Sequence, residues 1–167
     1  MSVKISYLNK LKSKTVSNVV LFVNENFNII NVKKFISIGE FSYISDLLKS
    51  SDLKKNIFVF EVNSKKKIVL ISIKNDLMNS DIENLGAEFY GRINYGKNSE
   101  YFINSNSVVG KYNNFLGYFL HGLKLKSYEF NKYKTKKENR IISVNIFGNK
   151  NKPSNHSQSK FKAIEEG

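Results

Sequence analysis

His121 and His156 are the only histidines of the chain, and histidine is the side chain best suited to bind a metal ion or to move a proton near neutral pH. No cluster of carboxylates lies at the spacing of metal ligands around either of them. The chain has no cysteine, so a thiolate metal site is excluded as well. We predict an exposed helix side chain at position 121, a loop residue at position 156, and no metal-binding residue.

Nucleophilic and acid–base catalysis have no motif here either. The chain contains no Gly-x-Ser-x-Gly sequence and no cysteine. Two acidic pairs, Asp81/Glu83 and Glu165/Glu166, fall in the first turns of predicted helices. Complementarity to the helix dipole explains carboxylates at such positions better than acid–base catalysis does. We therefore expect no catalytic and no cofactor-binding residue in this chain.

A phosphate-binding loop is also disfavoured. A nucleotide site in a doubly wound sheet is usually marked by a glycine-rich turn after a strand. The segment that follows the predicted strand Lys67–Ile73 is "KNDLMNSD", which has no glycine, and "YFINSNSVVGK" has only one. Close approach of the backbone to a phosphate is therefore not favoured at either place, and nucleotide binding stays a minor alternative.

The net charge of +13 would ordinarily suggest a nucleic acid or another anionic surface as partner. Of the 27 basic residues, however, only Arg92 and Arg140 are arginines, and the lysines are spread along the whole chain. The many asparagines and the scarcity of alanine are typical of AT-rich codon usage. Nucleic-acid sites favour arginine for its planar, bidentate fork, so this lysine excess is weaker evidence for such a partner.

The composition also bears on the compartment. The amino-terminal stretch "MSVKISYLNKLKSK" lacks the apolar run of a signal peptide, and no stretch approaches the roughly 18–20 apolar residues of a membrane span. The absence of cysteine fits a reducing environment. These features predict a soluble, cytoplasmic protein with no membrane partner.

The stretch "GLKLKSYEFNKYKTKK" (Gly122–Lys137) alternates lysines with Tyr128, Phe130 and Tyr133. Cations beside aromatic rings can hold a nucleic-acid strand by phosphate pairing and base stacking. The same pattern also suits a helix end that runs into a half-buried connection, with the aromatic rings inward and the lysines in water. Elementary physical chemistry favours the second interpretation, in which the rings pack and the lysines are solvated.

Hydrophobic periodicity predicts alternating strands and helices. Ser80 and Glu83 form a capping box that predicts the start of a helix. That helix is expected to end at Gly96, and its residues at helical spacing are Ile82, Leu85, Gly86, Phe89 and Ile93. A turn at "NEN" predicts a hairpin between Val16–Val23 and "FNII". The expected strands are Val3–Leu8, Val16–Val23, Asn56–Asn63, Lys67–Ile73, "EYFINS" and Arg140–Gly148; the expected helices are Glu40–Lys49, the one from Ser80, and Val109–Lys126.

This order predicts an α/β three-layer sandwich, with a mixed central sheet and helices on both faces. Residues 1–148 form the α/β domain, and residues 149–156 form a polar linker that contains Pro153, the only proline. Residues 157–167 begin a helix, with Phe161 and Ile164 at helical spacing. Because a lone helix this short is marginal in water, we expect the chain to be a fragment or truncated product of something longer.

The motif from Gly122 onward, followed by a strand, a polar gap and "FKAIEEG", resembles the amino-terminal domain of the leucyl aminopeptidase (cytosol aminopeptidase) family. In that family a Gly-x-x-Leu-x-Ser-Tyr-x-Phe-x-x-Tyr-Lys-Thr run closes the last long helix of the domain, and a helix then leads to the catalytic domain. The matching residues, expected to be packing residues rather than catalytic ones, are Gly122, Leu125, Ser127, Tyr128, Phe130, Tyr133, Lys134 and Thr135.

The resemblance implies a macro-domain-like fold and a role in assembly and positioning. It also implies a parent protein that removes amino-terminal residues from peptides, is usually a hexamer, and uses two divalent metals such as manganese or zinc to activate water. The metal ligands and catalytic residues belong to the carboxy-terminal domain, so none is expected here. The expected partners are that catalytic domain and sister subunits.

Two alternatives remain open at this stage. The first is a basic α/β domain that binds nucleic acid, motivated by the net charge. The second is a stand-alone macro-like module that binds ADP-ribose. The family commonly has a glycine-containing turn after the strand that corresponds to Lys67–Ile73, and its absence here weighs against the second alternative.

Overall fold

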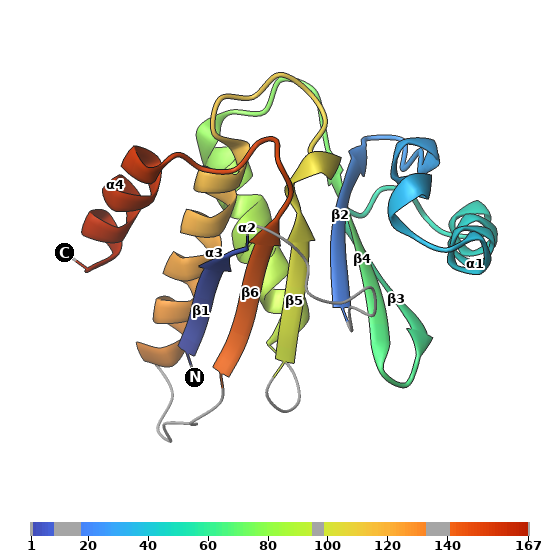
Figure 1. Cartoon of the computed structure of the whole chain (residues 1–167), viewed down its shortest axis with the longest axis horizontal. Coiled ribbons are helices and arrows are strands. Elements are labelled where there is room, and N and C mark those ends of the chain that lie inside the picture. The colour runs from blue at the N-terminus through green and yellow to red at the C-terminus, as the bar shows by residue number, and fades with distance from the viewer. Residues whose placement is uncertain (1, 9–17, 95–98, 133–140, 167) are drawn as a thin grey trace.

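The computed structural model describes residues 2–8, 18–94, 99–132 and 141–166 of the chain, which are the coloured parts of Figure 1. Their elements in chain order are β1 (Ser2–Tyr7), β2 (Asn18–Asn24), the 3-10 helix η1 (Ile30–Phe35), α1 (Ile38–Lys49), β3 (Ile57–Asn63), β4 (Lys66–Ile73), α2 (Asn79–Ile93), β5 (Ser99–Asn104), the 3-10 helix η2 (Ser105–Ser107), α3 (Phe115–Lys132), β6 (Ile141–Phe147) and α4 (Asn155–Glu166).

The strands form one mixed sheet in the order β1-β6-β5-β2-β4-β3. All neighbours are parallel except β3 and β4, which form an antiparallel hairpin. Strand β2 lies inside the sheet, where Val20 stands between Val69 of β4 and Ile103 of β5. Because a parallel strand inside a sheet is covered on both faces, β2 and β4 are continuous apolar runs rather than alternating ones.

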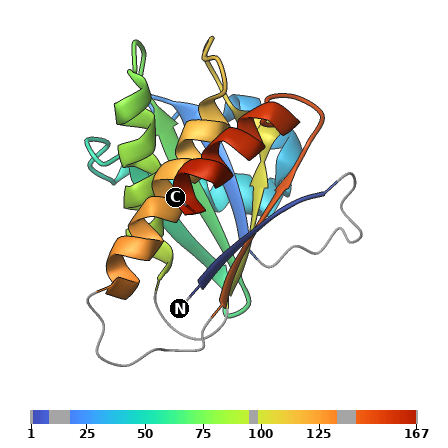
Figure 2. The same ribbon diagram turned by 90° about the vertical axis from the view of Figure 1, so that its left-hand side faces the viewer.

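Helices cover both faces of the sheet, which confirms the predicted α/β sandwich (Figures 1 and 2). Val20 and Phe22 of β2 belong to the core under α2 and α3. Val19 and Leu21 of the same strand belong to the second core, under η1 and α1. Burial in the first core raises the pKa of the Tyr101 hydroxyl above its ordinary value.

Helices α2 and α3 approach each other at two glycines. A Cβ atom on Gly86 of α2 would lie 1.9 Å from the Phe119 carbonyl oxygen of α3. A Cβ atom on Gly122 of α3 would lie 1.9 Å from the Glu83 carbonyl oxygen of α2. Backbone therefore touches backbone at both points, and no larger residue fits either position without moving a helix.

The predicted hairpin after β2 is wrong. The neighbours of β2 are the parallel strands β4 and β5, so the segment that follows β2 pairs with neither of its edges. Phe27 takes a left-handed conformation (φ 54°), and Phe27, Ile29 and Val32 are buried in the second core. These apolar side chains cover the sheet instead of extending it.

Several helix boundaries differ from the predictions, including the start of α1 at Ile38 rather than Glu40. The Asp81 carboxylate accepts a hydrogen bond from the Met78 N–H at 2.9 Å, so α2 begins before the predicted Ser80–Glu83 capping box. Helix α3 begins at Phe115 rather than Val109, because Gly110 and Asn114 take positive φ angles (87° and 62°) that interrupt a helix. Its end lies at Lys132, beyond the predicted Lys126, and the predicted stop of α2 at Gly96 lies outside the described residues.

Helix α4 begins at Asn155, two residues before the predicted start. It packs against α3 and lies in front of that helix in Figure 2. The segment before it is held on the domain, because the Lys152 ammonium donates to the Leu8 carbonyl at 2.7 Å and Pro153 is buried. No helix in the described ranges combines the length and the apolar character needed to cross a membrane.

Candidate functional site

The fold itself points to one place for a ligand, the edge where the parallel strands β2 and β5 end. The connection after β2 leads to η1 and α1 on one face, and the connection after β5 leads to α3 on the other face (Figure 1). In open α/β sheets the crevice between two such neighbouring strands is the usual ligand site.

In this chain the crevice is filled by the protein itself. The hydroxyl of Ser107, in η2, accepts a hydrogen bond from the Phe22 N–H at 3.0 Å and donates to the Asn104 carbonyl at 2.6 Å. Ser107 is only 4% exposed. The turn after β5 thus folds back onto β2, and its buried hydroxyl bonds the backbone of that strand.

Asparagine side chains take up the backbone N–H groups at the same edge. The Asn106 Oδ1 atom accepts from the N–H groups of Asn149 and Lys150, at 3.0 and 2.8 Å. The Asn24 Oδ1 atom accepts from Asn26 and Asn28, at 3.1 and 3.0 Å. Free backbone N–H groups are what a phosphate-binding edge offers, and these four are already bonded.

Gly148 lies at this edge with φ 122°, a conformation that favours glycine. A Cβ atom there would lie 2.4 Å from the Ser105 hydroxyl oxygen. The backbone after β6 therefore approaches the turn after β5 closely, and the two segments close this part of the edge against each other.

The described residues of the Gly122 motif divide into buried and exposed ones. Gly122 packs against α2, and the buried Ser127 donates its hydroxyl proton to the Lys124 carbonyl at 2.6 Å. Leu125 and Tyr128 are 40% and 42% exposed. The reason is that the segment continues α3 as a regular helix, which turns these positions away from α2.

Four other motif positions lie wholly or partly outside this description. Helix α3 includes Phe130, whose side chain lies outside the described part. Tyr133, Lys134 and Thr135 lie outside the described residues altogether.

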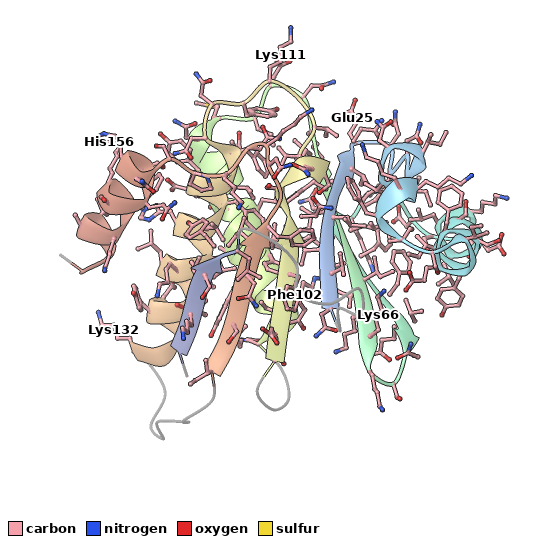
Figure 3. The ribbon with its side chains drawn as sticks, viewed as in Figure 1. Glu25, Lys66, Phe102, Lys111, Lys132 and His156 are labelled. Atoms are coloured by element: carbon pink, nitrogen blue, oxygen red, sulfur yellow. The ribbon has the colours of Figure 1, made fainter. Side chains whose placement is uncertain are left out.

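The two histidines are placed differently from the predictions. His121 is only 6% exposed, because Phe161 of α4 stacks on its ring with centroids 4.7 Å apart. His156 lies in the first turn of α4, not in a loop, and its side chain points away from the molecule (Figure 3). The described residues contain no group of three or more histidines and acidic residues that could hold a metal ion.

One of the two acidic pairs occupies a different place than expected. Asp81 lies in the first turn of α2, as predicted, where its carboxylate accepts from Met78. Glu165 and Glu166 come at the end of α4, because this helix begins at Asn155. Their predicted place in a first turn is therefore wrong.

A cavity of about 340 Å³ lies between β1, α3 and α4, and we name it the α3–α4 cavity. Its apolar walls include Ile5 of β1, Leu120 of α3 and Phe161 of α4. Its polar lining includes Lys124 and Tyr128 of α3, which come from the Gly122 motif. Sequence reasoning missed this cavity because it depends on the docking of α4, which no spacing pattern indicated.

Sequence comparison finds no match, whereas structure comparison finds solved structures of similar fold. No protein-family model and no curated protein matches the chain. A mutant of tomato leucine aminopeptidase matches with a TM-score of 0.63 at 12% identity, over 98% of this chain and 35% of that one. The macrodomain of Thermus aquaticus DarG matches with a TM-score of 0.53 at 10% identity, over 89% of this chain and 100% of that one.

The fold is macrodomain-like. At these identities the likeness shows the fold alone, and the chain spans about a third of the aminopeptidase that it matches. The aminopeptidase match covers 98% of this chain, and the remainder is shorter than the 12 residues of α4. The match therefore includes residues of α4.

Proposed function

We propose that this chain acts as the non-catalytic amino-terminal domain of a metal-dependent leucyl aminopeptidase, with a role in assembly and in positioning the catalytic part. The observation that carries the proposal is the likeness to leucine aminopeptidase over 98% of the chain, residues of α4 included. The Gly122 motif supports it from the sequence, since Gly122 sits at the closest approach of α2 and α3.

In this proposal the chemistry belongs to another domain. The two divalent metals that the family resemblance implies would polarise the peptide carbonyl and activate water. The described residues include no group of three or more histidines and acidic residues that could hold such ions, so in this proposal the metal ligands lie in the catalytic domain. The contribution of this chain is instead a rigid α/β body with α4 docked on α3.

The proposal is tested by assaying the purified 167-residue chain with leucine p-nitroanilide and Mn²⁺. We expect no turnover above the uncatalysed rate. Robust hydrolysis by the chain alone would contradict a non-catalytic role.

The ADP-ribose alternative is tested by calorimetric titration of the same protein. The filled edge at Ser107 and Asn106 predicts no heat of binding. A saturable signal would favour a stand-alone macro-like module instead.

The nucleic-acid alternative is tested by a gel shift at two salt concentrations. Binding driven by phosphate contacts must weaken steeply as salt rises. Tight binding at low salt that weakens steeply at high salt would favour the nucleic-acid role. No shift at low salt would exclude it.

A further inference from the structure

We propose that the α3–α4 cavity binds a small organic anion, one with a flat apolar body and a carboxylate or phosphate head group. This inference is independent of the proposed function, since it concerns a cavity away from the strand-end edge and is tested by binding alone. The cavity volume of about 340 Å³ falls in the range of small-molecule sites.

The apolar body of the ligand is matched by rings and aliphatic side chains on three elements. Leu120 of α3 and Ile5 of β1 line one part of the cavity, and Phe161 of α4 lines another. Phe161 is held in place by two ring contacts, with His121 at 4.7 Å and with Tyr118 at 5.2 Å between centroids. The apolar part is therefore already formed in the absence of a ligand.

The head group is matched by two lysines on facing helices. Lys124 comes from α3 and Lys162 from α4, and none of the described lining residues is acidic. Two cations in a lining whose described residues include no carboxylate make the cavity attractive to an anion, and its partial enclosure strengthens that attraction over one at an open surface.

Lys124 is positioned before any ligand arrives. Its ammonium group donates to the Val3 carbonyl at 2.9 Å and lies 5.5 Å from the centre of the Tyr128 ring. An ammonium group has three N–H donors, so the Val3 bond leaves two for a ligand. A lysine fixed in this way loses little side-chain entropy on binding an anion.

Gln158 and Tyr128 complete the polar lining. The Gln158 amide nitrogen donates to the Pro153 carbonyl at 3.0 Å, which fixes the amide at the start of α4. The Tyr128 hydroxyl adds a donor and acceptor on the α3 side.

The test uses the 167-residue chain and four probes, followed by backbone amide NMR. Phenylacetate and phenyl phosphate carry the two anionic head groups, benzyl alcohol carries the body without charge, and inorganic phosphate carries a head without the body. We expect the two acids to shift amide signals of residues 120–124 and 158–162, and the tighter of them to identify the head group. Both should bind at least fivefold more tightly than benzyl alcohol and inorganic phosphate.

Three variants separate the cavity from the general positive charge of the chain. Lys124→Met and Lys162→Met keep most of the side-chain stem and remove the charge, and each should weaken binding of the tighter acid at least fivefold. Lys111→Met, at an exposed lysine on the loop before α3, should leave binding unchanged. Amide spectra away from the cavity check that each variant is folded.

The proposal is overturned if the acids leave the amide signals of residues 120–124 and 158–162 unshifted in the unmodified chain. It is overturned equally if benzyl alcohol binds as tightly as the acids, or if Lys111→Met weakens binding as much as the cavity variants do. The first of these results is obtained with the unmodified chain, so it does not depend on the stability of the variants.

Discussion

The ring of Phe161 in α4 stacks on the imidazole of His121 in α3, with centroids 4.7 Å apart and planes 26° from parallel. This contact joins the last helix to the α/β body, and it leaves His121 only 6% exposed. It contributes to the position of α4, to the closure of the α3–α4 cavity and to the burial of His121.

Phe161→Ala should therefore loosen α4 without unfolding the sheet. Burial of a phenylalanine ring contributes about 1.5–3 kcal/mol, so amide exchange in α4 should rise roughly tenfold to a hundredfold. Ile164→Ala is the matched control, because Ile164 lies in the same helix and is 53% exposed. Unchanged α4 exchange in the Phe161 variant would show that this contact does not hold the helix.

Gly122→Ala should destabilise the whole domain, because the added methyl group would meet the Glu83 carbonyl of α2. We expect the free energy of unfolding to fall by roughly 1–3 kcal/mol or more. Gly91→Ala in α2 is the control: its Cβ atom would meet nothing within 4 Å, and helix propensity predicts a gain of about 0.5–1 kcal/mol. Urea unfolding of both variants measures the contrast, and two effects of the same sign would refute the close-packing argument.

Glu40→Gln should make stability less dependent on pH in the acid range. Burial acts to raise the pKa of Glu40, but the hydrogen bonds from Lys66 at 2.8 Å and from the Ser37 N–H outweigh it and hold the pKa below its ordinary value of 4.5. A lowered folded-state pKa adds stability that is present above 4.5 and is lost as the pH falls through the folded value.

The difference in unfolding free energy between the unmodified chain and this variant should therefore shrink as the pH is lowered from 6 to 3. Urea unfolding at several pH values measures it. Glu61→Gln, which removes an exposed acid on β3, controls for the change in net charge. A difference that grows toward acid pH would reverse the assigned sign.

Asn106→Ala should open the edge where the strands end. Loss of the Asn106 side chain removes the acceptor of the Asn149 and Lys150 N–H groups, so exchange of these two amides should accelerate. Asn113→Ala, at an exposed residue on the loop before α3, should leave them unchanged. If exchange at 149 and 150 stayed slow in the Asn106 variant, another group would have to protect them.

The layer order and the core could be predicted from the sequence because they depend on local periodicity. Ile82, Leu85, Phe89 and Ile93 repeat at helical spacing, and all of them are buried in α2 as predicted. Strands β3 and β4 followed in the same way from two apolar runs around a short polar turn.

The candidate sites could not be predicted in this way, because they depend on contacts between distant segments. The burial of His121 requires Phe161, forty residues further along the chain. The filled edge requires Asn106 to meet the backbone at 149 and 150. The exposure of Tyr128 follows from the continuation of α3 to Lys132, where charge and spacing indicated an irregular connection.

The central claim is that this chain serves a leucyl aminopeptidase without carrying its chemistry. An affinity tag is placed at the amino terminus in the native gene. The protein that the cell makes from this gene is then purified together with its bound partners. We predict Mn²⁺-dependent hydrolysis of leucine p-nitroanilide by that material and none by the isolated 167-residue chain. Natively tagged material that is pure, folded and inactive with Mn²⁺ or Zn²⁺ would contradict the claim.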